Sequence, residues 1–172
     1  MREPQAPVVR LEPMQERHWL EVCSIYLEGI ATGDATFETA APSWEEWDQG
    51  HLPFARIVAI APDGNVQGWA SLSLVSKRSA YAGVAEVSIY LAARARGKGV
   101  GSALLERLVQ ESELNGIWTL QASIFPENEA SLELHSRCGF REVGARTRIA
   151  KLKGVWRSTI LLERRSGISG QD

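Results

Sequence analysis

The order of apolar and polar residues along the chain predicts a mixture of helices and strands. Apolar side chains between Trp19 and Ile30 recur every three or four positions, which is the spacing of one helix face. Ser43 stands three residues before Glu46, and this capping-box pattern predicts a short helix through about Gly50. Two further helices are predicted, from residue 100 onward and at residues 128–138.

Strands are predicted where short apolar runs alternate with polar residues or lie between turn residues. The turn signals at residues 62–65 and 153–154 each predict a hairpin. The predicted strands are residues 8–11, 56–61, 67–76, 86–91, 117–124, 140–152 and 155–163. Because helices are mixed with antiparallel hairpins, the sequence predicts an α+β fold with a mixed central sheet of about seven strands and about four helices.

Composition and charge narrow the class of protein. The chain has 172 residues, of which 44% are hydrophobic and 23% charged, and these values exclude wholesale disorder. Lys and Arg number 19 against 21 Asp and Glu, so we expect no basic surface for nucleic acid. No apolar run approaches the ~20 residues of a membrane helix, so we expect no membrane partner.

The ends of the chain and its cysteines indicate a cytoplasmic protein. No apolar stretch typical of a secretion signal follows the first residues, and two cysteines in a chain of this size suggest reduced thiols. We expect one domain over residues 1–172, with an ordered core at 8–163 and a loose tail at 166–172. No His, Cys and Asp cluster has metal-site spacing, so we expect no metal, and His18 and His51 are predicted on the surface.

A glycine-rich turn, Arg-Gly-Lys-Gly-Val-Gly at residues 96–101, follows a predicted strand and opens a helix. The first N–H groups of a helix lack partners within it, and the helix dipole adds partial positive charge there. Such a turn suits a pyrophosphate, with further charge from Arg96 and Lys98. The Walker A motif and the dinucleotide fingerprint do not fit the spacing of these residues. A plain connector between strand and helix is the alternative.

Two motifs and the order of the elements resemble one family. Arg96-x-x-Gly99-x-Gly101 after a strand is similar to the acyl-CoA pyrophosphate motif of the GCN5-related N-acetyltransferase (GNAT) family. Residues 128–140 resemble the second motif of that family. Four segments further resemble the phosphinothricin and methionine-sulfoximine acetyltransferases, namely residues 35–39, 77–81, 86–90 and 124–128.

The resemblance implies transfer of acetyl from acetyl-CoA to the α-amine of a small amino acid or analogue. It also implies a homodimer with the acceptor site near the interface. The residues that it implies for acetyl-CoA binding are Val87, Ser88, Ile89, Tyr90, Leu91, Arg96, Gly97, Lys98, Gly99, Val100, Gly101, Ser102, Asn128 and Ser131. A backbone N–H near the end of the strand 86–91 is expected to bind the oxyanion.

Two residues are candidates for proton transfer. Glu86, on the strand before the glycine-rich turn, is the expected general base for the acceptor amine, and the alternative is a carboxylate at the rim of the sheet. His135 occupies the position where many family members have a tyrosine that protonates the leaving thiolate. An imidazole is able to serve as this acid, and the alternative is a histidine that is hydrogen-bonded within the helix packing.

The acceptor site is expected to bind the anionic ends of a glutamate mimic. Arg78 is the expected ligand of a carboxylate or phosphinate, because its planar fork binds such groups bidentately. Lys77 is the second candidate, and the rest of the wall is expected to come from Thr36, Phe37 and Tyr81.

Other readings stay open at this stage. The last strand has Trp156-Arg157-Ser158 where the resembling subgroup has Trp-x-Asp, so the acceptor end is less well defined than the cofactor end. A protein, polyamine or aminoglycoside acceptor is one alternative, and a non-catalytic acyl-CoA-binding module is another. Trp44 and Trp47 share one face of the short helix, which suits a cover over the acceptor cleft or a dimer contact.

Overall fold

One sheet of seven strands runs through the protein, whose computed structural model describes residues 7–172. The strands are β1 (Arg10–Pro13), β2 (Ile57–Ile60), β3 (Val66–Leu74), β4 (Val84–Leu91), β5 (Thr119–Ile124), β6 (Arg141–Leu152) and β7 (Val155–Arg165). Their order in the sheet is β1-β2-β3-β4-β5-β7-β6, and every neighbouring pair is antiparallel except β4 and β5. The predicted α+β architecture is confirmed. Residues 1–6, which precede the expected ordered core, lie outside the described range.

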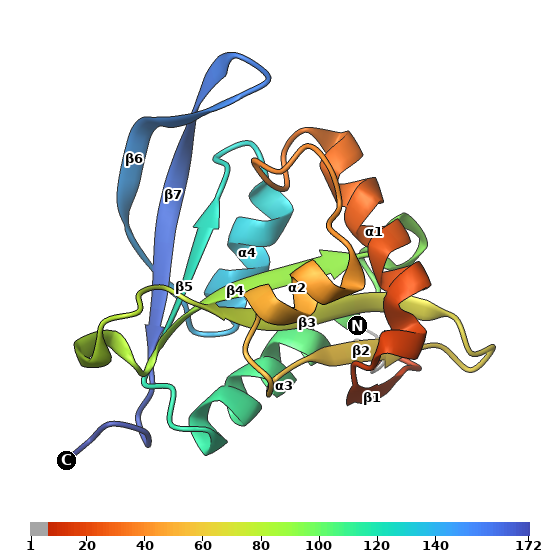
Figure 1. Cartoon of the computed structure of the whole chain (residues 1–172), viewed down its shortest axis with the longest axis horizontal. Helices are drawn as coiled ribbons and strands as arrows, with labels where there is room; N and C mark the ends of the chain where they lie inside the picture. The colour runs from red at the N-terminus through yellow and green to blue at the C-terminus, as the bar shows by residue number, and fades with distance from the viewer. Residues whose placement is uncertain (1–6) are drawn as a thin grey trace, which may run out of the picture.

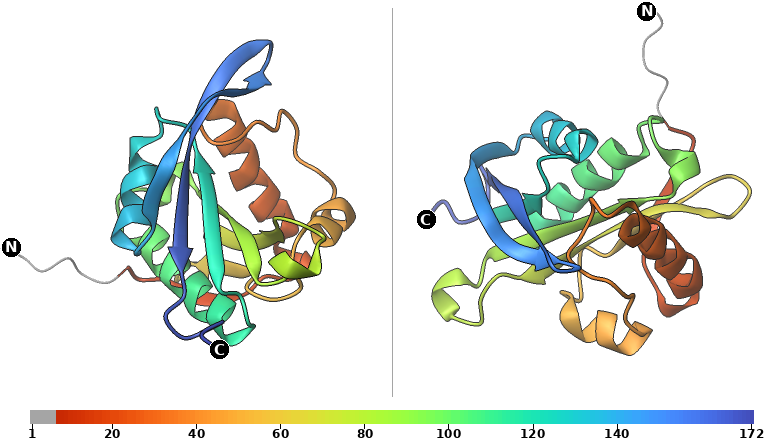
Figure 2. Two further views of the ribbon diagram at one scale, coloured as in Figure 1. Left: turned by 90° about the vertical axis from the view of Figure 1, so that its left-hand side faces the viewer. Right: turned by 90° about the horizontal axis from the view of Figure 1, so that it is seen from above.

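The helices cover both faces of this sheet (Figures 1 and 2). α1 (Trp19–Thr32) and α2 (Trp44–Gly50) lie on one face, and α3 (Val100–Leu114) and α4 (Glu129–Arg137) lie on the other. Apolar side chains of α3 and of α1 are fully buried against the sheet, among them Leu104, Leu105, Leu108 and Val22. Among the helices of residues 7–172, none is both long and apolar enough to cross a membrane.

Local sequence signals determine where the helices begin and end. Ser43 Oγ accepts a hydrogen bond from the Glu46 N–H at 3.2 Å, and Glu46 Oε2 accepts one from the Ser43 N–H at 3.0 Å. This reciprocal pair is the predicted capping box, and it starts α2. Asn128 Oδ1 accepts from the Ser131 N–H at 3.2 Å at the start of α4. α1 ends at Gly33, whose φ of 74° is left-handed.

The first strand lies two residues later than predicted. The expected strand 8–11 stops before Pro13, whereas β1 includes Pro13, which is the register partner of Ile57. β1 is an edge strand, and a proline is tolerated there because its missing N–H is not needed by a second neighbour.

β4 and β5 form a fork that positions the candidate site. The two strands pair only over Val84–Glu86 and Thr119–Gln121. Beyond this point β4 continues along β3 as far as Leu91, while β5 continues along β7 as far as Ile124. Because the two parallel strands diverge, the sheet is open between them after the Glu86–Gln121 register pair.

Two histidines differ from their predicted surface positions. His18 is buried, with Nδ1 accepting from the Gln15 N–H at 3.0 Å and Nε2 lying 3.1 Å from Glu12 Oε1. His51 is half-buried and stacks on Trp47 with 4.1 Å between the ring centroids. The prediction for His18 was wrong, because Gln15 and Glu12 satisfy its ring inside the fold. His51 is only partly at the surface, because the Trp47 ring covers one face of it and its Nδ1 lies 2.6 Å from the Trp47 carbonyl oxygen.

Residues 166–171 lie against the body of the protein, which differs from the predicted loose tail. Ser166 is buried, and its N–H donates to the Trp118 carbonyl at 2.8 Å. Its hydroxyl donates to Glu113 Oε1 at 2.9 Å. Arg165 Nη1 donates to the Ser169 carbonyl at 2.8 Å. Glycine and serine content indicated a loose segment, whereas these tertiary hydrogen bonds hold it.

Candidate active site

A cavity of about 730 Å³ passes through the fork between β4 and β5. On one face it is bounded by residues of α1, α2 and the loop that joins them, and on the other by the start of α4. The two fork strands, β3 and β7 contribute residues to the remaining walls. A cavity of this size accommodates a small organic ligand together with the end of a second one.

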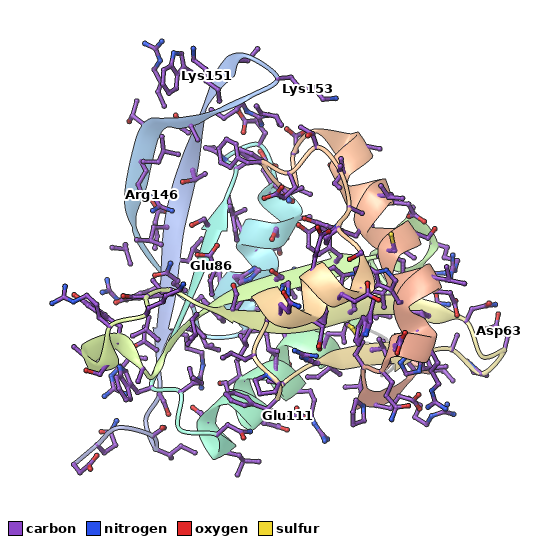
Figure 3. The ribbon with its side chains drawn as sticks, in the orientation of Figure 1. Asp63, Glu86, Glu111, Arg146, Lys151 and Lys153 are labelled. Atoms are coloured by element: carbon purple, nitrogen blue, oxygen red, sulfur yellow. The ribbon has the colours of Figure 1, made fainter. Side chains whose placement is uncertain are left out.

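Glu86 lies at the apex of the fork, in the cavity wall (Figure 3). Its register partner Gln121 donates a hydrogen bond from Nε2 to Glu86 Oε2 at 2.9 Å. This amide fixes one carboxylate oxygen, and within residues 7–172 the structure shows no side-chain hydrogen bond to the other. The carboxylate is therefore oriented and retains an oxygen able to accept a proton from a bound amine.

The free edge of β4 borders the cavity directly above Glu86. Val87, Ser88, Ile89 and Tyr90 all line it. β3 pairs with one edge of this strand up to Leu91, but β5 has already diverged from the other edge. Backbone N–H groups on the diverged edge are consequently available to a carbonyl oxygen of a ligand in the fork.

The glycine-rich turn lies just beyond the end of β4 and leads into α3. Gly97 and Gly99 have φ values of 70° and 79°, a region that glycine adopts without strain. Gly99 is the N-cap of α3 and provides no side chain to bond the first N–H groups. Arg96 and Lys98 are exposed beside it. Free N–H groups, the helix dipole and two cations make this turn suitable for a pyrophosphate.

Gly101 meets a different requirement from that of the other two glycines. A Cβ at this position would lie 3.1 Å from Leu134 Cδ2 and 3.2 Å from Leu91 Cδ1. The glycine therefore allows α3 to approach α4 and the end of β4 closely. This packing fixes the start of α3 relative to the fork. Residues 96–102 do not line the cavity itself, whereas Asn128 and Ser131 do.

His135 is buried in the cavity wall on α4. Its Nδ1 lies 2.8 Å from the Ser131 carbonyl oxygen, which only accepts, so Nδ1 carries a proton and donates it. Burial lowers the pKa of His135, and the ring is therefore neutral near pH 7 with a lone pair on Nε2. Nε2 is buried and has no partner among the described residues. This geometry makes Nε2 a hydrogen-bond acceptor and weighs against the expected role as acid.

Four aromatic rings form the wall on the α1 side, of which Tyr26 and Trp69 were not indicated by the sequence analysis, whereas Tyr90 and Trp47 were. Tyr90 packs between Tyr26 and Trp69, with 4.9 Å between centroids in both pairs. Trp47 lies edge-on to Trp69 at 5.8 Å. All four rings line the cavity. Burial raises the pKa of Tyr90, so its hydroxyl stays protonated at any ordinary pH.

The predicted acceptor residues fall into two groups. Thr36 and Phe37 line the cavity. Lys77, Arg78 and Tyr81 do not line it; they lie at the exposed connection between β3 and β4, where the Arg78 guanidinium stacks on Tyr81 at 5.5 Å. This connection projects from the sheet, away from α1 (Figure 1).

The charged side chains of the cavity wall are carboxylates. Glu38, Glu46 and Glu86 line it, and no Lys or Arg of residues 7–172 does. No group of three or more His, Cys, Asp or Glu in the described part of the chain is arranged to hold a metal ion. The wall is thus suited to a cationic amine.

A forked α+β sheet with an uncapped glycine-rich helix start beside the fork defines an acyltransferase architecture. The chain belongs to the Acetyltransferase (GNAT) family, whose model matches residues 16–140. The family predicted from the two motifs is confirmed.

Individual members of the family are similar to this chain over most of its length. YwnH of Bacillus subtilis is 40% identical over 138 residues, covering 77% of this chain and 84% of that protein. The phosphinothricin N-acetyltransferase of Alcaligenes faecalis is 35% identical over 153 residues, covering 83% and 75%. A phosphinothricin acetyltransferase of Sinorhizobium meliloti, solved with acetyl-CoA, has a TM-score of 0.85 at 30% identity and covers 96% of this chain and 92% of its own.

Proposed function

We propose that this protein transfers acetyl from acetyl-CoA to the α-amine of a small amino acid. The observation that carries the proposal is the oriented carboxylate of Glu86, in the cavity wall beside the free edge of β4. The names of the relatives, which include a methionine sulfoximine and methionine sulfone acetyltransferase of Pseudomonas aeruginosa, support this class of acceptor.

Acetyl-CoA supplies the acetyl group as a thioester. The backbone N–H groups of residues 97–102, with Arg96 and Lys98, are proposed to bind its pyrophosphate. The diverged edge of β4 binds the arm and the carbonyl oxygen. Asn128 has a structural role here, because its Oδ1 caps α4 and its Nδ2 donates to the Asp34 carbonyl at 3.2 Å.

Glu86 is proposed to remove the proton of the acceptor amine. Gln121 holds one oxygen of the carboxylate while the other accepts the proton. His135 contributes a fixed acceptor at Nε2, which suits an N–H or O–H of a bound ligand.

The charges of the cavity wall favour one kind of amino acid. Phosphinothricin carries two anionic groups, and the described wall offers three carboxylates and no Lys or Arg. A methionine sulfone or sulfoximine has one anionic group and a neutral side chain, for which the aromatic wall of Tyr26, Trp47 and Trp69 is better suited. We therefore propose the neutral methionine-like analogues as the preferred acceptors.

A homodimer, implied by the resemblance, is also part of the proposal. Light scattering measures the mass of the protein in solution and so tests it.

The release of CoA thiol from acetyl-CoA measures the proposed activity. The acceptors offered are phosphinothricin, methionine sulfone, methionine sulfoximine, spermidine and a lysine peptide. We expect turnover with the methionine analogues first. Glu86→Gln should lower kcat by ~10²–10⁴-fold, the usual size of a general-base contribution, and leave acetyl-CoA binding intact.

Glu142→Gln is the matched control, because Glu142 is an exposed carboxylate on β6 outside the cavity. It should keep the wild-type kcat. Equal activity of Glu86→Gln and wild type would remove Glu86 from the mechanism. Acetyl-CoA binding without turnover of any amine would instead favour a non-catalytic acyl-CoA-binding module.

A further inference from the structure

Arg157 of β7 joins three segments that are distant in the sequence. Its side chain is only 17% exposed. Nη1 donates to the Gly33 carbonyl at 2.8 Å, and Nη2 donates to Asp34 Oδ1 at 2.8 Å and to Glu127 Oε2 at 3.3 Å. The guanidinium also lies over the ring of Phe125, 4.1 Å from its centroid. One side chain thus contacts the end of α1, the segment after it and the connection between β5 and α4.

These contacts fix the start of the loop between α1 and α2. Gly33 is the left-handed residue that ends α1, and Asp34 is the next residue of the loop. The Asp34 carbonyl also accepts from Asn128 Nδ2 at 3.2 Å, so the segment is held from both β7 and α4. Four residues of this loop line the cavity immediately afterwards, at positions 35–38.

An aromatic pair extends the same connection into the cavity wall. Phe125, which the Arg157 guanidinium covers, packs edge-on against Phe37 with 4.8 Å between centroids. Both rings line the cavity. Arg157 therefore acts on the position of Phe37 by two routes. One is the hydrogen bonds to residues 33–34, and the other is the contact with the ring of Phe125.

We propose that Arg157 is a positioning residue that holds residues 34–38 against the cavity and thereby sets the affinity for the acceptor. This inference rests on the proposed function, since it assigns that loop to the acceptor. Arginine suits the task because its planar group donates in several directions while one face stacks on a ring. Lysine provides a single ammonium and cannot reproduce that set of contacts.

Hydrogen exchange and steady-state kinetics together test the inference. In Arg157→Gln the amides of residues 34–38 should exchange at least about tenfold faster, which corresponds to the loss of charged hydrogen bonds. The KM for the acceptor should rise by a similar factor, while the KM for acetyl-CoA stays within about twofold, because the glycine-rich turn is not touched. Arg157→Lys should have exchange rates and an acceptor KM between those of wild type and Arg157→Gln. Asp34→Asn should show a smaller increase in both.

The matched control is Arg164→Gln, which breaks another half-buried ion pair of β7. Arg164 Nη1 donates to Glu113 Oε1 at 2.9 Å, and neither residue lines the cavity. This variant should change neither exchange at residues 34–38 nor the acceptor KM.

Each outcome separates this inference from the proposed function. Unchanged exchange in both Arg157 variants would overturn the positioning role, and so would faster exchange with an unaltered acceptor KM. If the wild-type protein acetylates no amino acid, the proposed function fails, and the exchange rates alone then decide whether Arg157 holds the loop. Should Arg157→Gln not fold, Arg157→Lys and Asp34→Asn carry the same comparison.

Discussion

At the scale of single residues, the hydrogen-bond partner decides what an ionisable group in the cavity is able to do. Glu86 faces a donor, the amide of Gln121, and is held as a proton acceptor. His135 faces the carbonyl of Ser131, so the ring proton lies on Nδ1 and is donated to that carbonyl, and Nε2 carries none. Glu86 was predicted as a base and His135 as an acid; the hydrogen bond to Ser131 weighs against the role of His135, and the role of Glu86 stays a proposal. Sequence alone could not reveal this, because the partner of Glu86 lies on a strand 35 residues away.

Acid should destabilise the protein through His135, which is buried, and His51, which is half-buried. Burial lowers the pKa of both His135 and His51 in the folded state, so the unfolded chain binds protons more readily. The free energy of unfolding should therefore fall as pH drops through about 6.5, the ordinary histidine value. Urea unfolding at pH 7.5 and 5.5 measures this fall. This fall in the free energy of unfolding should be smaller in His135→Gln than in wild type. It should be smallest in the double variant that combines His135→Gln with His51→Gln. An identical fall in all three proteins would contradict the assignment.

At the scale of elements, local signals determine where the helices begin and end, and tertiary contacts determine which of their side chains line the cavity. The capping box at Ser43 correctly predicted the start of α2 from a few residues, and the left-handed Gly33 ends α1 in the same local way. Tyr90 and Trp47 were singled out from the sequence, but Tyr26 and Trp69 were missed, because they belong to α1 and β3 and only packing brings their rings together. Arg78 was assigned to the acceptor for its chemistry, whereas the connection that carries it lies outside the cavity wall.

A glycine inside α1 makes room for this aromatic packing. A Cβ on Gly29 would lie 2.7 Å from Cδ1 of Tyr90, and that ring is confined by Tyr26 and Trp69. Gly29→Ala should therefore destabilise the protein by about 1–3 kcal/mol, although alanine normally favours a helix. Gly50→Ala is the control, since nothing lies within 4 Å of its added Cβ, and it should be neutral or slightly stabilising. Urea midpoints measure both variants, and equal midpoints would contradict the close packing.

At the scale of the whole molecule, the fork in the sheet relates the fold to its chemistry. The order of strands and helices and the family motifs were predictable, because each depends on residues close together in the sequence. The cavity that crosses the sheet depends instead on the divergence of β4 from β5 after Glu86, which no periodicity encodes. The C-terminal segment shows the same limit, since its partners Glu113 and Trp118 belong to α3 and the residues before β5.

The anchoring of that segment should contribute measurably to global stability. The hydroxyl of Ser166 donates to Glu113 Oε1 at 2.9 Å and accepts from the N–H groups of Ile168 and Ser169 at 3.1 and 2.9 Å. Ser166→Ala leaves Glu113, whose side chain is only 13% exposed, with Arg164 as its remaining donor. A loss of about 1–3 kcal/mol in the free energy of unfolding is expected, as for other buried hydrogen bonds to charged groups. Ser169→Ala removes a half-buried hydroxyl of the same segment that makes no hydrogen bond within residues 7–172, and it should have little effect. Equal urea midpoints for Ser166→Ala and Ser169→Ala would contradict this prediction and show that the contacts of the segment with Glu113 do not stabilise the protein.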